Sequence, residues 1–373
     1  MNILITGAAG FIGSALCRRL APGNEVIGID IKGPTDRALN ITWEQADLAD
    51  LSSVGAICEK YSPDVIIHCA GIAQQKIGAI DSATYMRVNS EATANLAKAA
   101  AKYNPDISFI FLSSVSVYGE GPHPRGIRSA VTSEFHGAGI NPQITQNKKD
   151  VSRPSTISRT YGVNKGAKAQ KRKNDNGIGE ESTVGPSSDY AVSKLDAERR
   201  LIALFDEEII HNLVILRLAP VYAREWSLNL DRRVFAPRKV AYVRFGSGLQ
   251  KMSALARPSL VDFIQYLLQR LLHNSVVKIF NVCDSEAYDF NTIIRVFKES
   301  GIHPRRPLIS VPLSPVWFAT RLAGFLLPNK RKWLHSCYDK LAGNLIFDNS
   351  KMLGTGFAPR YSLETIFPKE RFQ

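Results

Sequence analysis

The chain has 373 residues, of which 45% are hydrophobic and 22% charged. This balance is ordinary for a globular protein and excludes a wholly disordered or fibrous chain. The length suggests two domains, or one large α/β unit with an appended part. A formal net charge of +13 favours anionic partners, which include nucleotides, phosphorylated metabolites, nucleic acid and an acidic membrane face.

The cysteines and the apolar segments bear on location. The five cysteines show no CxxC spacing, which argues against a zinc ribbon or a disulfide framework and favours a reducing, cytoplasmic environment. No metal site is expected. The first apolar run is too short for a signal peptide and lacks a basic flank. Since no uncharged apolar stretch of about 18 residues occurs, we expect no integral membrane association.

Short apolar runs alternate with segments of helical spacing in the N-terminal third. Residues 2–6 form an apolar run that ends at Gly7 and predicts a buried strand. Further strands are expected at 25–30, 64–68 and 108–112, and helices at 11–20, 51–61 and 84–103. This alternation predicts an α/β fold, a Rossmann-type doubly wound parallel sheet.

The alternation stops after Gly119 and returns near residue 190. The stretch 122–182 is polar and basic, with eleven Lys and Arg against five Asp and Glu, a net charge of +6. A loop of this length is typical of a lid, a binding loop or a disordered insertion. Beyond it we expect helices at 190–205, 259–272 and 314–327, and strands at 213–218 and 277–282.

A glycine pattern joins the first strand to the first helix. Gly7, Gly10 and Gly13 have the G-x-x-G-x-x-G spacing of a dinucleotide-binding turn, in which the helix N-terminus faces a pyrophosphate. The second expected strand ends in Asp30, whose carboxylate can accept the ribose hydroxyls and repels a 2′-phosphate. The pattern therefore predicts NAD rather than NADP. Asp47 either reaches the adenine ring or is an ordinary surface or capping residue.

Tyrosine and lysine four residues apart form a second pattern. Tyr190 and Lys194 share one face of the helix expected at 190–205. An ammonium beside a phenol lowers the phenol pKa, so Tyr190 can accept a proton from an alcohol while hydride leaves the carbon. Tyr161 and Lys165 have the same spacing. We favour Tyr190, because a turn and helix-cap signal precedes it, whereas glycines flank the earlier pair.

A serine-rich segment follows the strand expected at 108–112. Ser113, Ser114 and Ser116 stand where ligands bind in open parallel sheets. A hydroxyl there can orient a substrate oxygen between the tyrosine and the cofactor. The plain alternative is ordinary serine turn chemistry.

Taken in order, these motifs resemble the extended short-chain dehydrogenase/reductase family, in its nucleotide-sugar epimerase/dehydratase branch. The resemblance is carried by the glycine pattern, Asp30, His68-Cys69-Ala70-Gly71, Asn89, Ser113 to Gly119, Tyr190 with Lys194, and Arg217 to Tyr222. It spans roughly 1–120 and 183–285. It implies an NAD-binding Rossmann domain, a smaller C-terminal domain that binds a nucleotide diphosphate sugar, expected to be UDP-linked, and usually a homodimer.

The resemblance also assigns candidate residues. The proton-transfer set is Ser114, Tyr190 and Lys194. The cofactor set is Gly7, Gly10, Phe11, Ile12, Gly13, Asp30, Asp47, Leu48, Ala70, Asn89, Tyr190 and Lys194. The substrate set is Ser114, Ser116, Arg224 and Arg257. The implied domains are 1–121 plus 183–217 with a return near 259–285, the insertion 122–182, and 218–258 plus 286–373.

Two departures from the family pattern narrow the function. The 4,6-dehydratases carry Asp-Glu, and the decarboxylases Glu, where this chain has Val115 and Ser116. What remains is hydride chemistry at one carbinol. We expect a nucleotide-sugar 4-epimerase, with a 4-keto-sugar reductase as the alternative. An alcohol or sterol dehydrogenase ranks third, and a non-catalytic dinucleotide sensor or scaffold is the alternative of another class.

The second departure concerns substrate binding. Pro220 replaces an asparagine that commonly helps to hold the substrate in this family. The candidates for contacts with the substrate phosphates are therefore Arg224, Arg232, Arg233 and Arg257.

Two further segments have more than one interpretation. The apolar run 316–327 could touch a membrane or a lipid-linked sugar, but at this length it is more typical of a core helix of the smaller domain. The basic cluster 168–173 could contact nucleic acid. No aromatic residues interleave its lysines, so we expect a solvated loop and no nucleic-acid partner.

Overall fold

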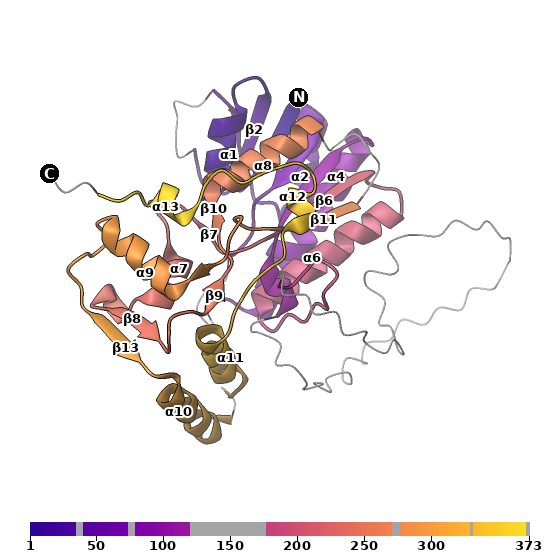
Figure 1. Ribbon diagram of the computed structural model, residues 1–373. Helices are drawn as coiled ribbons and strands as arrows, with labels where there is room; N and C mark the ends of the chain where they lie inside the picture. Colours follow the sequence, from indigo (N-terminus) through magenta and orange to yellow (C-terminus); the bar gives the residue numbers. More distant parts are fainter. Residues whose placement is uncertain (35–39, 74–78, 120–176, 271–276, 329–330, 371–373) are drawn as a thin grey trace. The chain divides into compact units, whose positions relative to one another are not determined.

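In the computed structural model of the protein, the described residues are 1–34, 40–73, 79–119, 177–270, 277–328 and 331–370. Met1–Pro122 and Asn176–Gln373 form one compact unit (Figure 1). Tyr161, the basic cluster 168–173 and all of the predicted insertion before residue 177 lie outside the described residues. The predicted domain boundaries stay a prediction.

A seven-stranded sheet, parallel throughout, forms the centre of this unit, in the order β11-β6-β5-β4-β1-β2-β3. The strands are β1 (Asn2–Thr6), β2 (Glu25–Asp30), β3 (Thr42–Gln45), β4 (Val65–His68), β5 (Ser108–Ser114), β6 (Asn212–Leu218) and β11 (Val277–Val282). The chain runs outward from β1 to β3 and then returns to β4 on the other side of β1. Ligands bind at such a reversal, beyond the carboxyl ends of the strands.

Helices follow the strands as the alternation predicts. The helices α1 (Gly13–Leu20) and α8 (Arg257–Arg270) pack together, while α2 (Leu51–Tyr61), α4 (Ala92–Tyr103) and α6 (Asp189–Asp206) form a second group. A π-helical turn, Arg87–Glu91, joins α3 (Ser82–Met86) to α4. Side-chain caps at Asp50 and Ser188 fix the starts of α2 and α6. The predicted Rossmann-type fold is confirmed.

The remainder of the unit has short strand pairs and helices. The pairs are β7 (Val221–Tyr222) with β10 (Leu255–Ala256), β9 (Lys251–Met252) with β12 (Tyr288–Asp289), and β8 (Tyr242–Phe245) with β13 (Leu308–Val311). The helices are α7 (Leu228–Val234), α9 (Phe290–Glu299), α10 (Leu313–Leu326), α11 (Arg331–Ala342), α12 (Ser350–Leu353) and α13 (Leu363–Ile366). An apolar core of its own, which includes Tyr222, Tyr242, Phe290 and Phe297, holds α7, α9 and α13 against these strands.

One expectation about this part is wrong. The helix expected at 314–327 exists as α10, but it is not a core helix. Gly324 is its one buried residue, and most of its large apolar side chains are exposed, while Leu313 and Val316 are partly buried. Among the described residues, no helix is both long and apolar enough to cross a membrane.

Candidate functional site

The turn after β1 has no room for side chains at its three glycines. Gly7 has a φ of 66°, and a Cβ there would stand 2.8 Å from the Ala70 nitrogen. A Cβ at Gly10 or Gly13 would lie 2.9 Å or 2.1 Å from the Gly7 carbonyl oxygen. The chain therefore needs glycine at all three positions, and the bare backbone leads directly into the N-terminus of α1.

Asp30 faces this turn from the end of β2. One carboxylate oxygen accepts a hydrogen bond from the Ala9 N–H at 3.0 Å, and the other accepts from the Lys32 N–H at 3.0 Å. A carboxylate has about four lone-pair sites, so capacity for further donors remains on each oxygen. After β3, Asp47 accepts from the Ala49 N–H at 2.9 Å, and Leu48 is buried. Asp47 and Leu48 thus shape the neighbouring turn.

Buried polar side chains fix the segment after β4. Asn89, in the π-helical turn, accepts from the Ile72 N–H at 2.7 Å and donates to the Ile72 carbonyl at 3.0 Å and to Ser193 Oγ at 3.1 Å. The Ala70 N–H donates to Thr6 Oγ1 at 3.2 Å. Asn89 therefore ties the loop that carries Ala70 to helix α6, and its position is explained by this role.

Ser114 and Tyr190 meet at the carboxyl end of β5. Ser114 is the last residue of that strand, and its Oγ accepts from the Ser116 hydroxyl at 2.9 Å. A hydrogen bond between Tyr190 and Ser114 lowers the Tyr190 pKa, but burial is the larger effect and raises it overall. The ring of Tyr85 packs edge-on against Tyr190, with 6.4 Å between centroids. The structure thus brings together two members of the predicted proton-transfer set.

Lys194 lies one turn further along α6, as the spacing predicts. Its Nζ donates to the Leu112 carbonyl at 2.9 Å and stands 4.6 Å from the centroid of the Phe111 ring. Only 6% of the residue is exposed, and burial lowers its pKa to about 8. The expectation that the ammonium lowers the Tyr190 pKa is wrong for this geometry, because desolvation dominates at both residues.

A buried ion pair lies near the strand ends and was not predicted from the sequence. Glu198 and Arg217 pair at 2.7 Å, and Ser113 Oγ donates to Glu198 at 2.5 Å. Arg217 also donates to Tyr118 Oη at 2.9 Å. Arg217 therefore stabilises the residues around the site from within the core and is not part of the surface of the site. Glu198 could have indicated this pair from the sequence, because it lies one helical turn after Lys194 on α6.

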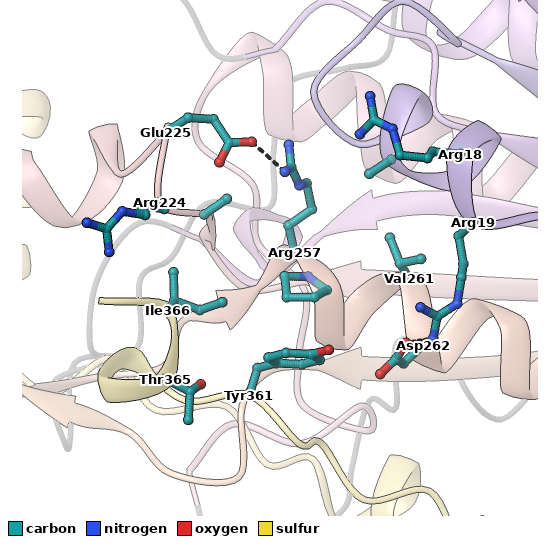
Figure 2. A pocket seen from close by; sticks show the side chains of 13 residues that line it. Arg18, Arg19, Arg224, Glu225, Arg257, Val261, Asp262, Tyr361, Thr365 and Ile366 are labelled. Atoms are coloured by element: carbon teal, nitrogen blue, oxygen red, sulfur yellow. Dashed lines mark hydrogen bonds and ion pairs between the residues drawn. The ribbon is translucent and has the colours of Figure 1, made fainter. Parts of the chain in front are cut away.

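Two of the predicted substrate residues share a pocket with a volume of about 480 Å³. Arg224 and Arg257 line it together with Arg18 and Arg19 of α1 (Figure 2). Arg257 pairs with Glu225, donates to the Phe11 carbonyl at 3.2 Å and covers the Phe11 ring. Arg233 instead donates to the Lys340 carbonyl at 2.5 Å. Among the described residues that line the pocket, none belongs to the proton-transfer set.

The amino-acid sequence is similar to those of known proteins. Residues 3–142 match the model of the NAD dependent epimerase/dehydratase family. The chain is 26% identical to UDP-glucose 4-epimerase of Vibrio cholerae over 374 residues. This alignment covers 98% of the chain and 93% of that protein. Over its N-terminal part the chain is thus similar to the NAD-dependent epimerase/dehydratase family. A second relative, dTDP-glucose 4,6-dehydratase of Salmonella typhimurium, is 31% identical over 151 residues, which are 35% of this chain and 42% of that enzyme.

Solved structures of epimerases share the fold. The UDP-Glc/GlcNAc 4-epimerase of Campylobacter jejuni superposes with a TM-score of 0.67 at 19% identity, covering 98% of this chain and 96% of the other. UDP-glucuronic acid 4-epimerase of Bacillus cereus, in complex with NAD, gives 0.63 at 21% identity and covers 99% and 97%. The predictions of the family, of an enzyme and of NAD as its cofactor agree with these matches.

Proposed function

We propose that this protein is a nucleotide-sugar 4-epimerase of the NAD-dependent epimerase/dehydratase family. The observation that carries the proposal is the meeting of Ser114 and Tyr190 at the strand ends, with Lys194 one helical turn away on α6. Oxidation of a carbinol requires a group that takes the hydroxyl proton, and a tyrosine held by a serine meets that requirement. The full-length similarity to UDP-glucose 4-epimerase supports the same reaction.

The residues present fit NAD. The turn at Gly7, Gly10 and Gly13 offers a backbone surface that a Cβ would fill, which suits a pyrophosphate at the start of α1. Asp30 would hold the ribose hydroxyls, and Lys194 the second ribose. When bound, NAD supplies the acceptor and donor of hydride.

The chain's own groups handle the proton. Tyr190 Oη would accept the proton of the sugar C4 hydroxyl, and Ser114 Oγ would orient that oxygen. Because burial favours the neutral phenol, the proton can return to the sugar from the same Tyr190. Lys194, held by the Leu112 carbonyl, is expected to bind the second ribose rather than to set the Tyr190 pKa.

The turn after Ser114 supports epimerisation or reduction over elimination. Val115 and Val117 are buried, and the Ser116 hydroxyl is bonded to Ser114. This turn contributes no carboxyl group for proton removal at a neighbouring carbon. A 4-keto-sugar reductase of the same fold is the second candidate, favoured by the same residues. We further propose that Arg224 and Arg257 bind the diphosphate of a UDP-sugar and that the protein forms a homodimer.

Conversion of UDP-galactose to UDP-glucose, followed by proton NMR with NAD present, tests the proposal. Tyr190→Phe should reduce turnover about 10²–10⁴-fold because the general base is lost. The matched control is Tyr161→Phe, which removes the other tyrosine of the same spacing and should leave turnover unchanged. If Tyr161→Phe is inactive and Tyr190→Phe is not, the proton acceptor has been assigned to the wrong tyrosine.

The same assay separates the alternatives. A reductase would leave UDP-galactose unchanged and would oxidise NADH when given a UDP-4-keto-6-deoxy sugar. A sensor would do neither while still binding NAD. Calorimetric titration should show tighter binding of NAD than of NADP, since a 2′-phosphate would meet the Asp30 carboxylate. Tighter binding of NADP would weaken the case for an epimerase that recycles its cofactor.

A further inference from the structure

Helix α10 presents an unusual outer surface. Its exposed apolar side chains are Trp317, Phe318, Leu322, Phe325 and Leu326, which we call the α10 face. Phe325 is 83% exposed and Phe318 is 64% exposed. Just before the helix, Leu308 and Ile309 of β13 are exposed as well. A soluble helix usually buries its apolar stripe and exposes polar residues, so this arrangement is reversed.

The spacing of these residues shows that the α10 face is continuous. Phe318, Leu322 and Phe325 stand at i, i+4 and i+7, which places them on one stripe. Helix α10 packs on α11 (Figure 1). This contact involves the Gly324 side of the helix, where a Cβ would lie 3.2 Å from Arg331 Cγ. The stripe therefore points away from the partner helix, and within the described residues no other element covers it.

The sequence around α10 is rich in positive charge, and its first acidic residue after Glu299 is Asp339 in α11. Between residues 300 and 338 the chain has six Lys and Arg and no Asp or Glu. Arg305 and Arg306, ahead of β13, are exposed, and so is Arg331 at the start of α11. The Arg321 guanidinium lies 4.8 Å from the centroid of the Trp317 ring. Apolar and aromatic residues bordered by cations are typical of helices that lie in the headgroup region of an anionic bilayer.

We propose that the α10 face docks the enzyme onto an anionic membrane surface. At 14 residues α10 is too short to span a bilayer, so it would lie in the plane of the interface, with its aromatic side chains among the acyl chains. A second copy of this chain would bring the same uncompensated cations against themselves, which disfavours a symmetric dimer through this face. The docking would hold the active site at the membrane without changing its chemistry.

Co-sedimentation of the full-length protein with vesicles tests the docking. We expect binding to vesicles of phosphatidylglycerol and phosphatidylcholine at low salt, and weak binding to phosphatidylcholine alone. Phe318→Ser with Phe325→Ser should lower the partition coefficient about 100-fold, because burial of one large apolar side chain corresponds to about tenfold or more. Since α10 does not contribute to the proposed catalytic set, turnover of a water-soluble substrate should stay unchanged.

Two further variants keep the test decisive. Leu249→Ser removes another exposed apolar side chain, outside the α10 face, and should bind as the wild type does. Arg305→Gln with Arg306→Gln and Arg321→Gln should lose the preference for anionic lipid while the apolar face stays intact. Failure of the wild type to sediment with phosphatidylglycerol vesicles would overturn the proposal. Unchanged vesicle binding by the Phe318→Ser, Phe325→Ser variant would also overturn it. A change of that variant from dimer to monomer in analytical ultracentrifugation would do the same, because the α10 face would then be a dimer interface.

Discussion

Strand β5 and helix α10 are both strongly apolar, and the fold treats them in opposite ways. In β5 all residues from Ser108 to Ser113 are buried, with neighbouring strands on both sides. In α10 the aromatic side chains face outward, and Gly324 is the one buried residue. The difference shows that apolar composition sets how much surface a segment must hide, whereas its neighbours decide whether the protein itself hides it.

The two segments also differ in what their surroundings fix. Around β5, backbone and buried polar groups leave little freedom: His68 bonds to Thr6 at 2.7 Å and to Thr93 at 2.8 Å, and it stacks on Phe111. Such a setting holds Ser114 and Lys194 in place for chemistry. Around α10 the side chains are free to meet a second surface, which suits binding and not catalysis.

Truncation of one phenylalanine in each segment should give the largest contrast. Phe109→Ala in β5 should lower the free energy of unfolding by about 3–5 kcal/mol, because it leaves a cavity in a packed core. Phe325→Ala in α10 should change it by less than about 0.5 kcal/mol, since the side chain is solvated in the folded and unfolded states. Urea unfolding measures both values. Equal losses would mean that the α10 face is covered within the protein.

The sequence was informative wherever neighbours along the chain determine the outcome. The strand from Asn2 to Thr6, the glycine turn, and the cap at Ser188 ahead of Tyr190 were predicted from local patterns and are present in the structure. The edge strand β3 was missed because its four residues are only partly buried or exposed and carry no clear alternation. The pairing of Glu198 with Arg217 joins residues from a helix and a strand, so it depends on the packed fold.

Glycine offers a second contrast, here between the turn after β1 and helix α10. Gly7→Ala should destabilise the protein by about 1–2 kcal/mol through its left-handed backbone, with about 1–3 kcal/mol more from the clash with the backbone of Ala70. It should also weaken NAD binding. In Gly324→Ala the new Cβ is tight only against the flexible Arg331 side chain and makes ordinary contacts with His335 and the Arg331 Cα, and the helix gains propensity, so the net change should stay within about 1 kcal/mol. Thermal unfolding and calorimetric titration of NAD provide the measurements.

The chemistry of the site was harder to predict than its location. The pairing of Tyr190 with Lys194 suggested a lowered phenol pKa, but pairing is only one of three influences. Burial acts on both residues and favours the neutral form of each, which a sequence pattern does not reveal. The exposure of α10 was missed for a related reason. A short apolar helix is usually covered by its own chain, and only the packed structure shows that this one is not.

A buried and an exposed cation should differ in how stability depends on pH. Burial lowers the Lys194 pKa from 10.5 to about 8. Between these values the unfolded chain keeps the proton that the folded protein has lost, so stability from this group rises with pH. From pH 7.5 to 10 the wild type should gain about 2 kcal/mol relative to Lys194→Met, at roughly 1.4 kcal/mol per pKa unit. The control Arg321→Met, in the α10 helix, should differ from the wild type by the same amount at both pH values, because a guanidinium does not titrate in this range. Urea unfolding at the two pH values gives the comparison. A constant difference for Lys194→Met as well would show that the ammonium is solvated in the folded protein, and the buried position assigned to it beside Leu112 would then be wrong.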